Sequence, residues 1–239
     1  GRRAGQGAGS RPGGLPHRSR RAGSRPGGRP HRGIAMHLLP TQEEIVQLLE
    51  DTGALREGHF EYRSGLHSRD YLQVALAMRY YQHQRTLSVA LSRLVRANLE
   101  LHAMIPKLSI VAPATGGLPV AYGVCEALEA RLVYWGEKQN ESEPMQFRQH
   151  MVVEEGEKVL LVDDILRTGK KITELKRLVE SQGGEVVGLA VVVYQPTPRS
   201  PDFKSLPFFH LVKLDGIYYT DAASCELCRR GTPLEKVWA

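Results

Sequence analysis

The sequence predicts an α/β protein built on a parallel sheet with helices on both faces. From residue 108 onward, short apolar segments alternate with segments of helical periodicity. Strands that are apolar throughout are typical of parallel sheets, because both of their faces are buried. The chain has 239 residues, of which 41% are hydrophobic, so it is long enough to bury a substantial core.

The first 35 residues differ in composition from the rest of the chain. They carry nine arginines but no lysine or acidic residue, and Gly9–Arg18 recurs almost unchanged as Gly23–Arg32. Such a segment buries too little apolar surface to offset the entropy of ordering it, so we expect residues 1–35 to be a disordered leader. A chain start at Met36 would be consistent with this interpretation.

The positive charge of the chain belongs to this leader. The whole chain has a net charge of +6, so the part that follows the leader is net acidic. The overall basicity is therefore no reason to expect that the folded part binds nucleic acid, and an RNA contact remains an alternative for the leader alone. The sequence contains no apolar run of about 18 residues, which excludes a membrane-spanning helix.

A helix with both ends marked is predicted at the start of the N-terminal region, residues 36–103. Thr41 and Glu44 have the spacing of a capping box, and Gly53 suits the left-handed position that follows a helix. The apolar periodicity predicts the later elements, including those of the core and C-terminal tail over residues 104–239. In chain order they are a loop over 54–68, a helix over 70–103 with a break near 82–84, a strand over 108–112, a helix over 118–130, strands over 132–135 and 158–162, a helix over 171–181, and strands over 186–193 and 208–214.

Two adjacent acidic residues, Asp163 and Asp164, follow the apolar strand that ends at Val162, and a short loop leads from them into a helix. Backbone N–H groups at that helix start, the helix dipole and two lysines favour a phosphate, and the carboxylates can accept hydrogen bonds from vicinal sugar hydroxyls. The segment therefore predicts a ribose 5-phosphate site, and an ordinary strand–turn–helix with exposed charges is the simpler alternative. The predicted site consists of Asp163, Asp164, Ile165, Leu166, Arg167, Thr168, Gly169, Lys170 and Lys171.

This segment resembles the ribose-phosphate motif of the type I phosphoribosyltransferases, in which two acids follow four apolar residues and precede a Thr-Gly loop. Residues 57–68 resemble the N-terminal hood of the orotate branch of that family. Residues 112–118 resemble its pyrophosphate loop, and residues 137–138 with 145–148 resemble its mobile catalytic loop. The resemblance implies the fold of the family: a parallel sheet with a small N-terminal hood and a flexible loop.

The resemblance also implies a reaction: transfer of ribose 5-phosphate from phosphoribosyl pyrophosphate to a nucleobase, with orotate favoured, Mg²⁺ as cofactor and a homodimer as the assembly. The alternatives are an enzyme for another base and a weakly active relative that binds nucleotides as a regulator. The implied catalytic residues are Asp163, Asp164, Lys138 and Arg148. Thr115, Gly116 and Gly117 would bind the pyrophosphate of the donor together with the segment above. Base-binding roles fall to Arg63, Tyr71, Arg167 and Tyr194.

Arg167 stands where the orotate enzymes commonly have a Thr, and three further departures from the family pattern motivate the regulator alternative. Lys171 stands where a Ser or Thr usually donates to the 5-phosphate, and Tyr194 stands where the orotate enzymes have an Arg for the orotate carboxylate. Glu137 reduces the positive charge of the mobile loop. Arg167 is the residue expected to meet the carboxylate instead.

The chain has three cysteines, which is too few for a disulfide framework and fits a reducing, cytoplasmic location. Cys125 is expected in the core, and Cys225 and Cys228 form a single C-x-x-C near the C-terminus. A structural zinc needs four ligands, and no second C-x-x-C supplies them. His210 could contribute one, but a staple of the tail or two reduced thiols is the preferred interpretation, and no residue is assigned to a metal.

Overall fold

The architecture is taken from a computed structural model. The predicted leader, residues 1–35, and the predicted base-binding residue Arg63 lie outside the part of the chain that it describes. The residues described are 39–62, 64–140, 142–197, 200–201, 203 and 205–237.

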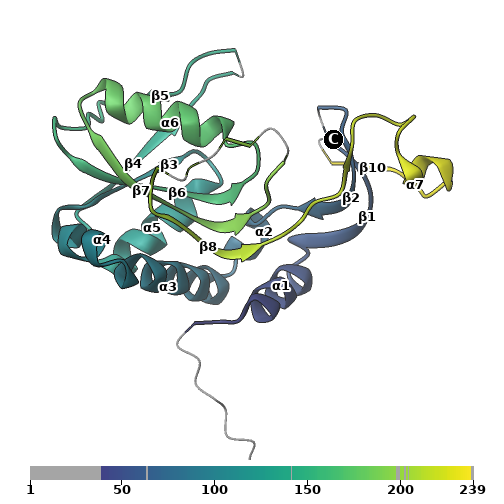
Figure 1. The fold of residues 1–239 in the computed structure, drawn as a ribbon, viewed down its shortest axis with the longest axis horizontal. Coiled ribbons are helices and arrows are strands. Elements are labelled where there is room, and N and C mark those ends of the chain that lie inside the picture. Colours follow the sequence, from purple (N-terminus) through teal and green to yellow (C-terminus); the bar gives the residue numbers. More distant parts are fainter. Residues whose placement is uncertain are drawn as a thin grey trace, which may run out of the picture. The chain divides into compact units, whose positions relative to one another are not determined.

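A six-stranded sheet in the order β5-β4-β3-β6-β7-β8 forms the centre of the domain (Figure 1). Five neighbouring strands are parallel, and only β5 at the edge is antiparallel to its neighbour β4. This confirms the predicted α/β class. The strands are β3 (Ser109–Pro113), β4 (Leu132–Glu137), β5 (Gln146–Phe147), β6 (Lys158–Leu166), β7 (Glu185–Tyr194) and β8 (Phe208–Lys213).

Helices cover both faces of this sheet. Helices α3 (Tyr81–Ala97), α4 (Leu99–Met104) and α5 (Gly117–Leu128) lie on one face, and α6 (Lys170–Ser181) lies on the other (Figure 1). A single turn of 3₁₀ helix, η1 (Ile105–Lys107), leads from α4 into β3.

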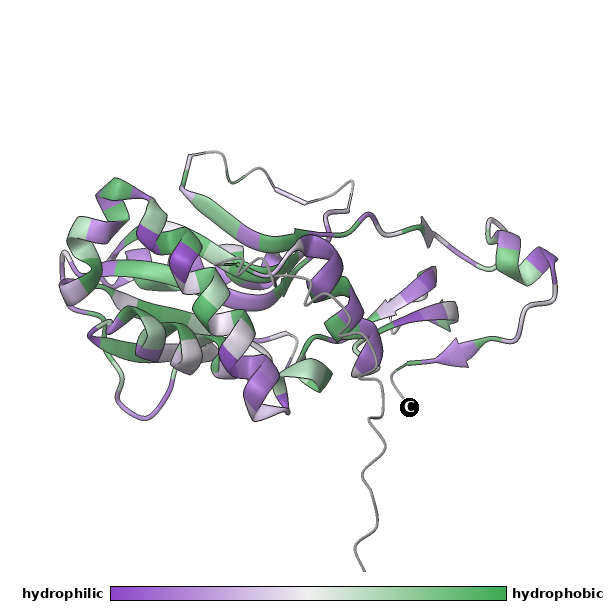
Figure 2. Ribbon diagram, turned by 90° about the horizontal axis from the view of Figure 1, so that it is seen from below, coloured by the Kyte–Doolittle hydropathy of each residue, from purple (hydrophilic) through white to green (hydrophobic). Residues whose placement is uncertain are grey.

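The two faces of the sheet carry separate apolar clusters. Successive residues of a strand point to opposite faces, so Ile110 and Leu160 pack with α3 and α5, whereas Val111 and Leu161 pack with α6. Hydrophobic residues accordingly continue along the strands of the main sheet in Figure 2. This double burial explains why the strands read as continuous apolar runs.

A second, smaller sheet is formed by the N-terminal hairpin and two short strands of the C-terminal tail, in the order β10-β1-β2-β9. The hairpin strands β1 (Leu55–Glu61) and β2 (His67–Leu72) are antiparallel. From the tail, β9 (Tyr218–Tyr219) pairs antiparallel with β2, and β10 (Glu235–Lys236) pairs parallel with β1. The short helix α7 (Glu226–Arg229) lies between them in the chain.

The prediction for this hairpin was wrong in two respects. The expected loop over 54–68 contains β1, and the helix expected from residue 70 starts only after β2 and the short helix α2 (Ala75–Met78). His59, His67 and Ser68 fill buried positions of the hairpin, so the sequence lacks the apolar alternation that marks a strand. Helix α3 also continues through residues 82–84, and the break falls at Asn98, whose side chain caps α4.

The first helix, α1 (Gln42–Asp51), has the predicted ends. The Thr41 hydroxyl accepts the Glu44 N–H at 3.2 Å, and the Glu44 carboxylate accepts the Thr41 N–H at 2.8 Å, which completes the capping box. Gly53 follows with φ +68°. None of the helices in the described part of the chain is long and apolar enough to cross a membrane.

A buried carboxylate, Glu157, joins three parallel strands at the amino end of the main sheet. It accepts hydrogen bonds from the hydroxyls of Ser109 on β3 and Tyr134 on β4, and from the Glu154 N–H at 2.8 Å. The Arg131 guanidinium lies 3.8 Å from the Glu157 carboxylate and balances its negative charge. Burial and the neighbouring Glu157 carboxylate raise the pKa of Tyr134. The network satisfies polar groups that would otherwise be buried without a partner.

We expect Glu157→Ala to lower the free energy of unfolding by about 2–3 kcal/mol, because it leaves two hydroxyls and one N–H without their acceptor. Glu155→Ala is the matched control, since Glu155 is exposed two residues earlier. It should change stability by less than about 0.5 kcal/mol. Urea unfolding followed by circular dichroism measures both, and equal effects would show that the network does not stabilise the sheet.

Candidate active site

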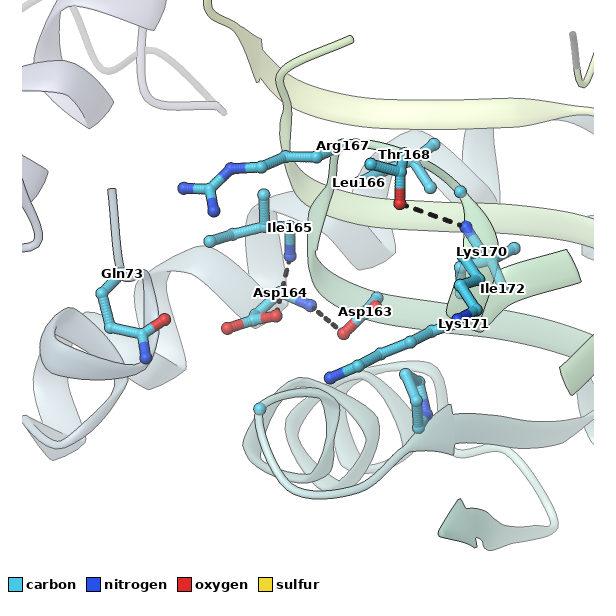
Figure 3. A pocket seen from close by; sticks show the side chains of 13 residues that line it. Gln73, Asp163, Asp164, Ile165, Leu166, Arg167, Thr168, Lys170, Lys171 and Ile172 are labelled. Atoms are coloured by element: carbon cyan, nitrogen blue, oxygen red, sulfur yellow. Dashed lines mark hydrogen bonds between the residues drawn. The ribbon is translucent and has the colours of Figure 1, made fainter. Parts of the chain in front are cut away.

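The central strand β6 carries the predicted acid pair near its carboxyl end. The strand runs four residues further than predicted and continues through Asp163 and Asp164 to Leu166. Both acids are buried, with 6% and 9% of their surface exposed. Each carboxylate accepts the N–H of the following residue, Asp163 from Asp164 at 2.9 Å and Asp164 from Ile165 at 2.8 Å (Figure 3).

The electrostatics of the pair are unfavourable to two negative charges. Burial, and then the neighbouring Asp164 carboxylate, raise the pKa of Asp163 well above its usual range, and the Lys171 ammonium acts in the opposite direction. The side chain of Lys171 extends from the start of α6 toward the acids (Figure 3). A cation near the pair would hold both carboxylates in their charged form.

The turn between β3 and α5 approaches the acids so closely that a side chain at either of its glycines would crowd a carboxylate. A Cβ at Gly116 would lie 2.8 Å from Asp164 Oδ2, and a Cβ at Gly117 would lie 3.2 Å from Asp163 Oδ1. Strands β3 and β6 are parallel neighbours, so the turns after them meet at the same edge of the sheet. The peptide bond between Ala114 and Thr115 in this turn is cis.

The loop after β6 and this turn line one cleft (Figure 3). Gly169 has φ +69°, a conformation that glycine adopts readily, and α6 begins directly after it. The Thr168 hydroxyl accepts the Lys170 N–H at 3.4 Å. The residues that line the cleft are Gln73, Pro113, Gly116, Asp163, Asp164, Ile165, Leu166, Arg167, Thr168, Gly169, Lys170, Lys171 and Ile172.

A second hollow adjoins the first and shares Thr168, Lys170 and Lys171 with it. Thr115 and Lys138 also line this hollow, so the structure brings the predicted pyrophosphate turn and one predicted catalytic lysine together. The Lys138 ammonium lies 2.7 Å from the Glu174 carboxylate of α6. A negatively charged ligand here would meet three ammonium groups and the N-terminus of α6, while the carboxylates of Glu137 and Glu174, which also line the hollow, oppose it in part.

Comparison with known proteins identifies the family. Residues 82–210 match the family model described as the phosphoribosyl transferase domain. The orotate phosphoribosyltransferase of Thermus thermophilus is 33% identical over 195 residues, which are 81% of this chain and 100% of that protein. The chain belongs to the phosphoribosyl transferase family. The orotate phosphoribosyltransferase of Acidithiobacillus ferrooxidans is 35% identical over 82% of this chain and 96% of that protein.

Solved structures agree with the predicted family fold. Orotate phosphoribosyltransferase from Aeropyrum pernix superposes with a TM-score of 0.57 at 19% identity, over 71% of this chain and 93% of that one. Adenine phosphoribosyltransferase from Leishmania donovani superposes with a TM-score of 0.52 at 20% identity, over 73% and 82%. The likeness to enzymes for two different bases concerns the fold, and the base is a separate question.

Arg167 lies at one side of the cleft, where hydrogen bonds hold its side chain in place. Its Nε donates to Gln195 Oε1 at 2.9 Å, and one terminal N–H group donates to the Leu72 carbonyl at 2.6 Å. Its guanidinium lies 5.4 Å from the centre of the Tyr62 ring. The Tyr218 hydroxyl also donates to Gln195 Oε1, at 2.9 Å, and burial raises the pKa of Tyr218 to about 12.

Two polar residues near the site, Gln73 and Gln195, are not among the residues that the sequence predicts for it. Gln73 follows strand β2 of the hairpin and lines the cleft, but the sequence was interpreted there as a helix. Gln195 is the first residue after β7 and is only 2% exposed. A polar residue directly after a long buried strand is a signal that could have pointed to it.

Four predicted site residues are not among the described residues that line the cleft or the adjoining hollow: Gly117, Tyr71, Tyr194 and Arg148. Gly117 begins α5 beside Asp163. Tyr71 packs against Phe60 and lies under Arg56. The ring centres of Tyr194 and Phe208 lie 5.0 Å apart in an edge-to-face contact, on the side of the sheet that α6 covers. Because side chains alternate along a strand, that of Tyr194 points away from that of Gln195. Arg148 follows β5 at the edge of the sheet.

We expect Asp163→Asn to stabilise the fold at neutral and higher pH. The pKa of Asp163 is raised in the folded state, so a penalty on folding builds up as the pH rises from the lower pKa of the unfolded chain to the folded-state pKa, and the amide removes this penalty. The gain in the free energy of unfolding should shrink toward about pH 4, where the unfolded Asp also becomes neutral.

Urea unfolding between about pH 4 and pH 8 measures this difference. Asp215→Asn, at a side chain that is 93% exposed, is the control and should change stability by less than about 0.5 kcal/mol. A stability gain that grows as the pH falls would contradict the interpretation.

Proposed function

We propose that this chain transfers ribose 5-phosphate from phosphoribosyl pyrophosphate to orotate and releases pyrophosphate and orotidine 5′-monophosphate. The observation that carries the proposal is the buried acid pair facing the Gly116-Gly117 turn in one cleft, next to the start of α6. The relatives named orotate phosphoribosyltransferase, which the chain matches over 96–100% of their length, favour orotate as the base.

The reaction separates charge, and the cleft has groups for both signs. The bond between the ribose C1 and pyrophosphate breaks, the electron pair leaves with the pyrophosphate, and a base nitrogen then bonds to C1. Asp163 and Asp164 would bind the ribose hydroxyls and stabilise positive charge on the ring. Lys138 and the N–H groups of the turn at Thr115 would receive the pyrophosphate. Catalysis of this kind consists of positioning and electrostatic stabilisation.

The donor set of the cleft fits a magnesium ion. Two adjacent carboxylates supply the oxygen ligands that Mg²⁺ prefers. Burial, and then the Asp164 carboxylate, raise the pKa of Asp163, and a bound cation would act against both effects. Asp163 and Asp164 would hold the ion together with substrate oxygens. When bound, Mg²⁺ neutralises charge that develops on the pyrophosphate.

Arg167 would take the orotate carboxylate in place of the arginine that Tyr194 replaces. Its guanidinium is already oriented by Gln195 and the Leu72 carbonyl, which lowers the entropic cost of binding a ligand. A guanidinium carries five N–H donors, so these two bonds leave others for a carboxylate. Gln73 lines the same cleft and adds a polar group.

The family resemblance adds a homodimer to the proposal, and the small number of cysteines adds a cytoplasmic location. The cleft described above is built from one copy of the chain. Sedimentation velocity of the full chain decides whether a second copy is present.

We expect Asp164→Asn to lower kcat for pyrophosphate release by at least about 100-fold, because the charge that stabilises the ribose cation is lost. The change keeps the size of the side chain, and Asp215→Asn is a matched control that should retain full activity. The assay uses phosphoribosyl pyrophosphate, Mg²⁺ and, in separate reactions, orotate, uracil and adenine.

Calorimetric titration of the unaltered chain with phosphoribosyl pyrophosphate and Mg²⁺ completes this test. The absence of heat at millimolar ligand would reject the proposal. Binding without turnover for any base would support the regulator alternative, and turnover of uracil or adenine but not orotate would reject orotate alone.

We expect Arg167→Met to raise KM for orotate by roughly 100-fold and to affect KM for phosphoribosyl pyrophosphate much less, because the variant lacks the donors for the carboxylate. Arg69→Met is the control, since Arg69 is half exposed on the hairpin beside Glu57. Steady-state kinetics with each substrate varied in turn measure the two KM values. An equal rise in both would place Arg167 at the donor rather than at the base.

A further inference from the structure

Four side chains of the kinds that ligate metals meet far from the acid pair in sequence, between the hairpin and the C-terminal tail. His59 on β1 and His67 on β2 face Cys225 and Cys228 at the start of α7, and the four potential ligand atoms lie within 4.8 Å of one another. The two imidazole nitrogens, His59 Nε2 and His67 Nδ1, are 3.0 Å apart.

The spacing of these atoms is that of ligands around one small ion. Cys225 Sγ lies 3.5 Å from His59 Nε2, and Cys228 Sγ lies 3.6 Å from His59 Nε2 and 3.4 Å from His67 Nδ1. A tetrahedral zinc with usual bond lengths separates nitrogen and sulfur ligands by about 3.6 Å and two nitrogens by about 3.3 Å. The side chains therefore need only small adjustments to share an ion.

The surroundings of His59 set its ring in the tautomer that a metal requires. Its Nδ1 lies 2.8 Å from the Thr232 carbonyl, which can only accept, so this nitrogen carries the proton. The other nitrogen, Nε2, then presents a lone pair to the cluster. Histidine ligands of zinc are commonly oriented in this way by a carbonyl bonded to their second nitrogen.

The cluster is closed to solvent on most sides. His59 and His67 are 3% and 4% exposed, Cys225 is fully buried, and Cys228 is partly buried. Two thiolates and two neutral imidazoles balance the charge of a divalent ion, so the loaded site is neutral and suits this burial. A full set of four protein ligands is typical of structural zinc sites rather than catalytic ones.

We propose that His59, His67, Cys225 and Cys228 form a structural zinc site that fastens the C-terminal tail to the N-terminal hairpin. Zn²⁺ displaces one proton from each thiol and involves no redox change. The tail leaves the edge of β2 at β9 and returns to the edge of β1 at β10. Helix α7, with the cysteines at its start, lies between these two contacts (Figure 1). Each of these tail strands is only two residues long, so they provide few hydrogen bonds.

His210, the histidine that the sequence offered as a possible ligand beside the cysteines, does not belong to this cluster. His210 lies on β8 with its ring 5.5 Å from that of Tyr194, whereas the structure brings His59 and His67 to the two cysteines. The missing ligands belong to a hairpin that was interpreted as a loop, and they come about 160 residues before the cysteines. The proposal does not depend on the proposed function, because none of the four residues lines the cleft.

The first test measures metal in the full chain after expression in zinc-containing medium and dialysis into metal-free buffer. Mass spectrometry of the metal should find about one zinc per chain, since four ligands hold one ion. Cys228→Ser and His67→Asn should each lose most of it. Cys125→Ser is the matched control, because Cys125 lies in α5 with its thiol against the Ala130 carbonyl, and it should retain zinc like the unaltered chain.

The second test uses the unaltered chain and so does not depend on how the variants fold. After chelation of the metal, addition of Co²⁺ should produce the strong visible absorption of a tetrahedral site and a thiolate charge-transfer band, and Zn²⁺ should remove both. The chelator should also lower the melting temperature. The proposal is overturned if the unaltered chain holds no zinc and shows no cobalt bands, if both cluster variants keep their zinc, or if the isolated chain carries a Cys225–Cys228 disulfide.

Discussion

The contact between the acid pair of β6 and the glycine turn after β3 constrains the rest of the structure. Two buried carboxylates at the end of the central strand are costly unless hydrogen bonds and positive charge surround them. The N–H groups of Asp164 and Ile165 and the ammonium of Lys171 supply part of this compensation. The glycines let a second loop approach within van der Waals distance of the carboxylates. A phosphorylated sugar with its cation would complete the set of charges.

The side of the cleft that would receive the base is built by three separate parts of the chain. The hairpin contributes the Leu72 carbonyl and Gln73, the main sheet contributes Gln195, and the tail contributes Tyr218. Arg167 is bonded directly to the first two of these parts. The orientation of its guanidinium is therefore a property of the folded domain rather than of the loop that carries it, which is how a site becomes organised before its ligand arrives.

The proposed zinc site and this side of the cleft share the same tail. The segment that carries Cys225 and Cys228 continues from β9, where Tyr218 donates to Gln195. Short strands at a chain end are easily lost to fraying unless another interaction holds them. A metal that fastens the tail would support the hydrogen bond from Tyr218 without taking part in the chemistry.

The sequence by itself determined the local elements whose signals are local. Continuous apolar runs predicted the parallel strands, the Thr41–Glu44 spacing predicted the first helix cap, and the acid pair followed by Thr-Gly predicted a loop that the structure places beside Gly116. Only the tertiary structure decided which distant residues meet. Gln73 lines the cleft and Gln195 accepts a hydrogen bond from its arginine, whereas Tyr71 and Tyr194 do neither. His59 and His67 lie beside the two cysteines. Such meetings depend on strand order, side-chain alternation and the path of the tail, which arise from packing over the whole chain and leave no short-range pattern in the sequence.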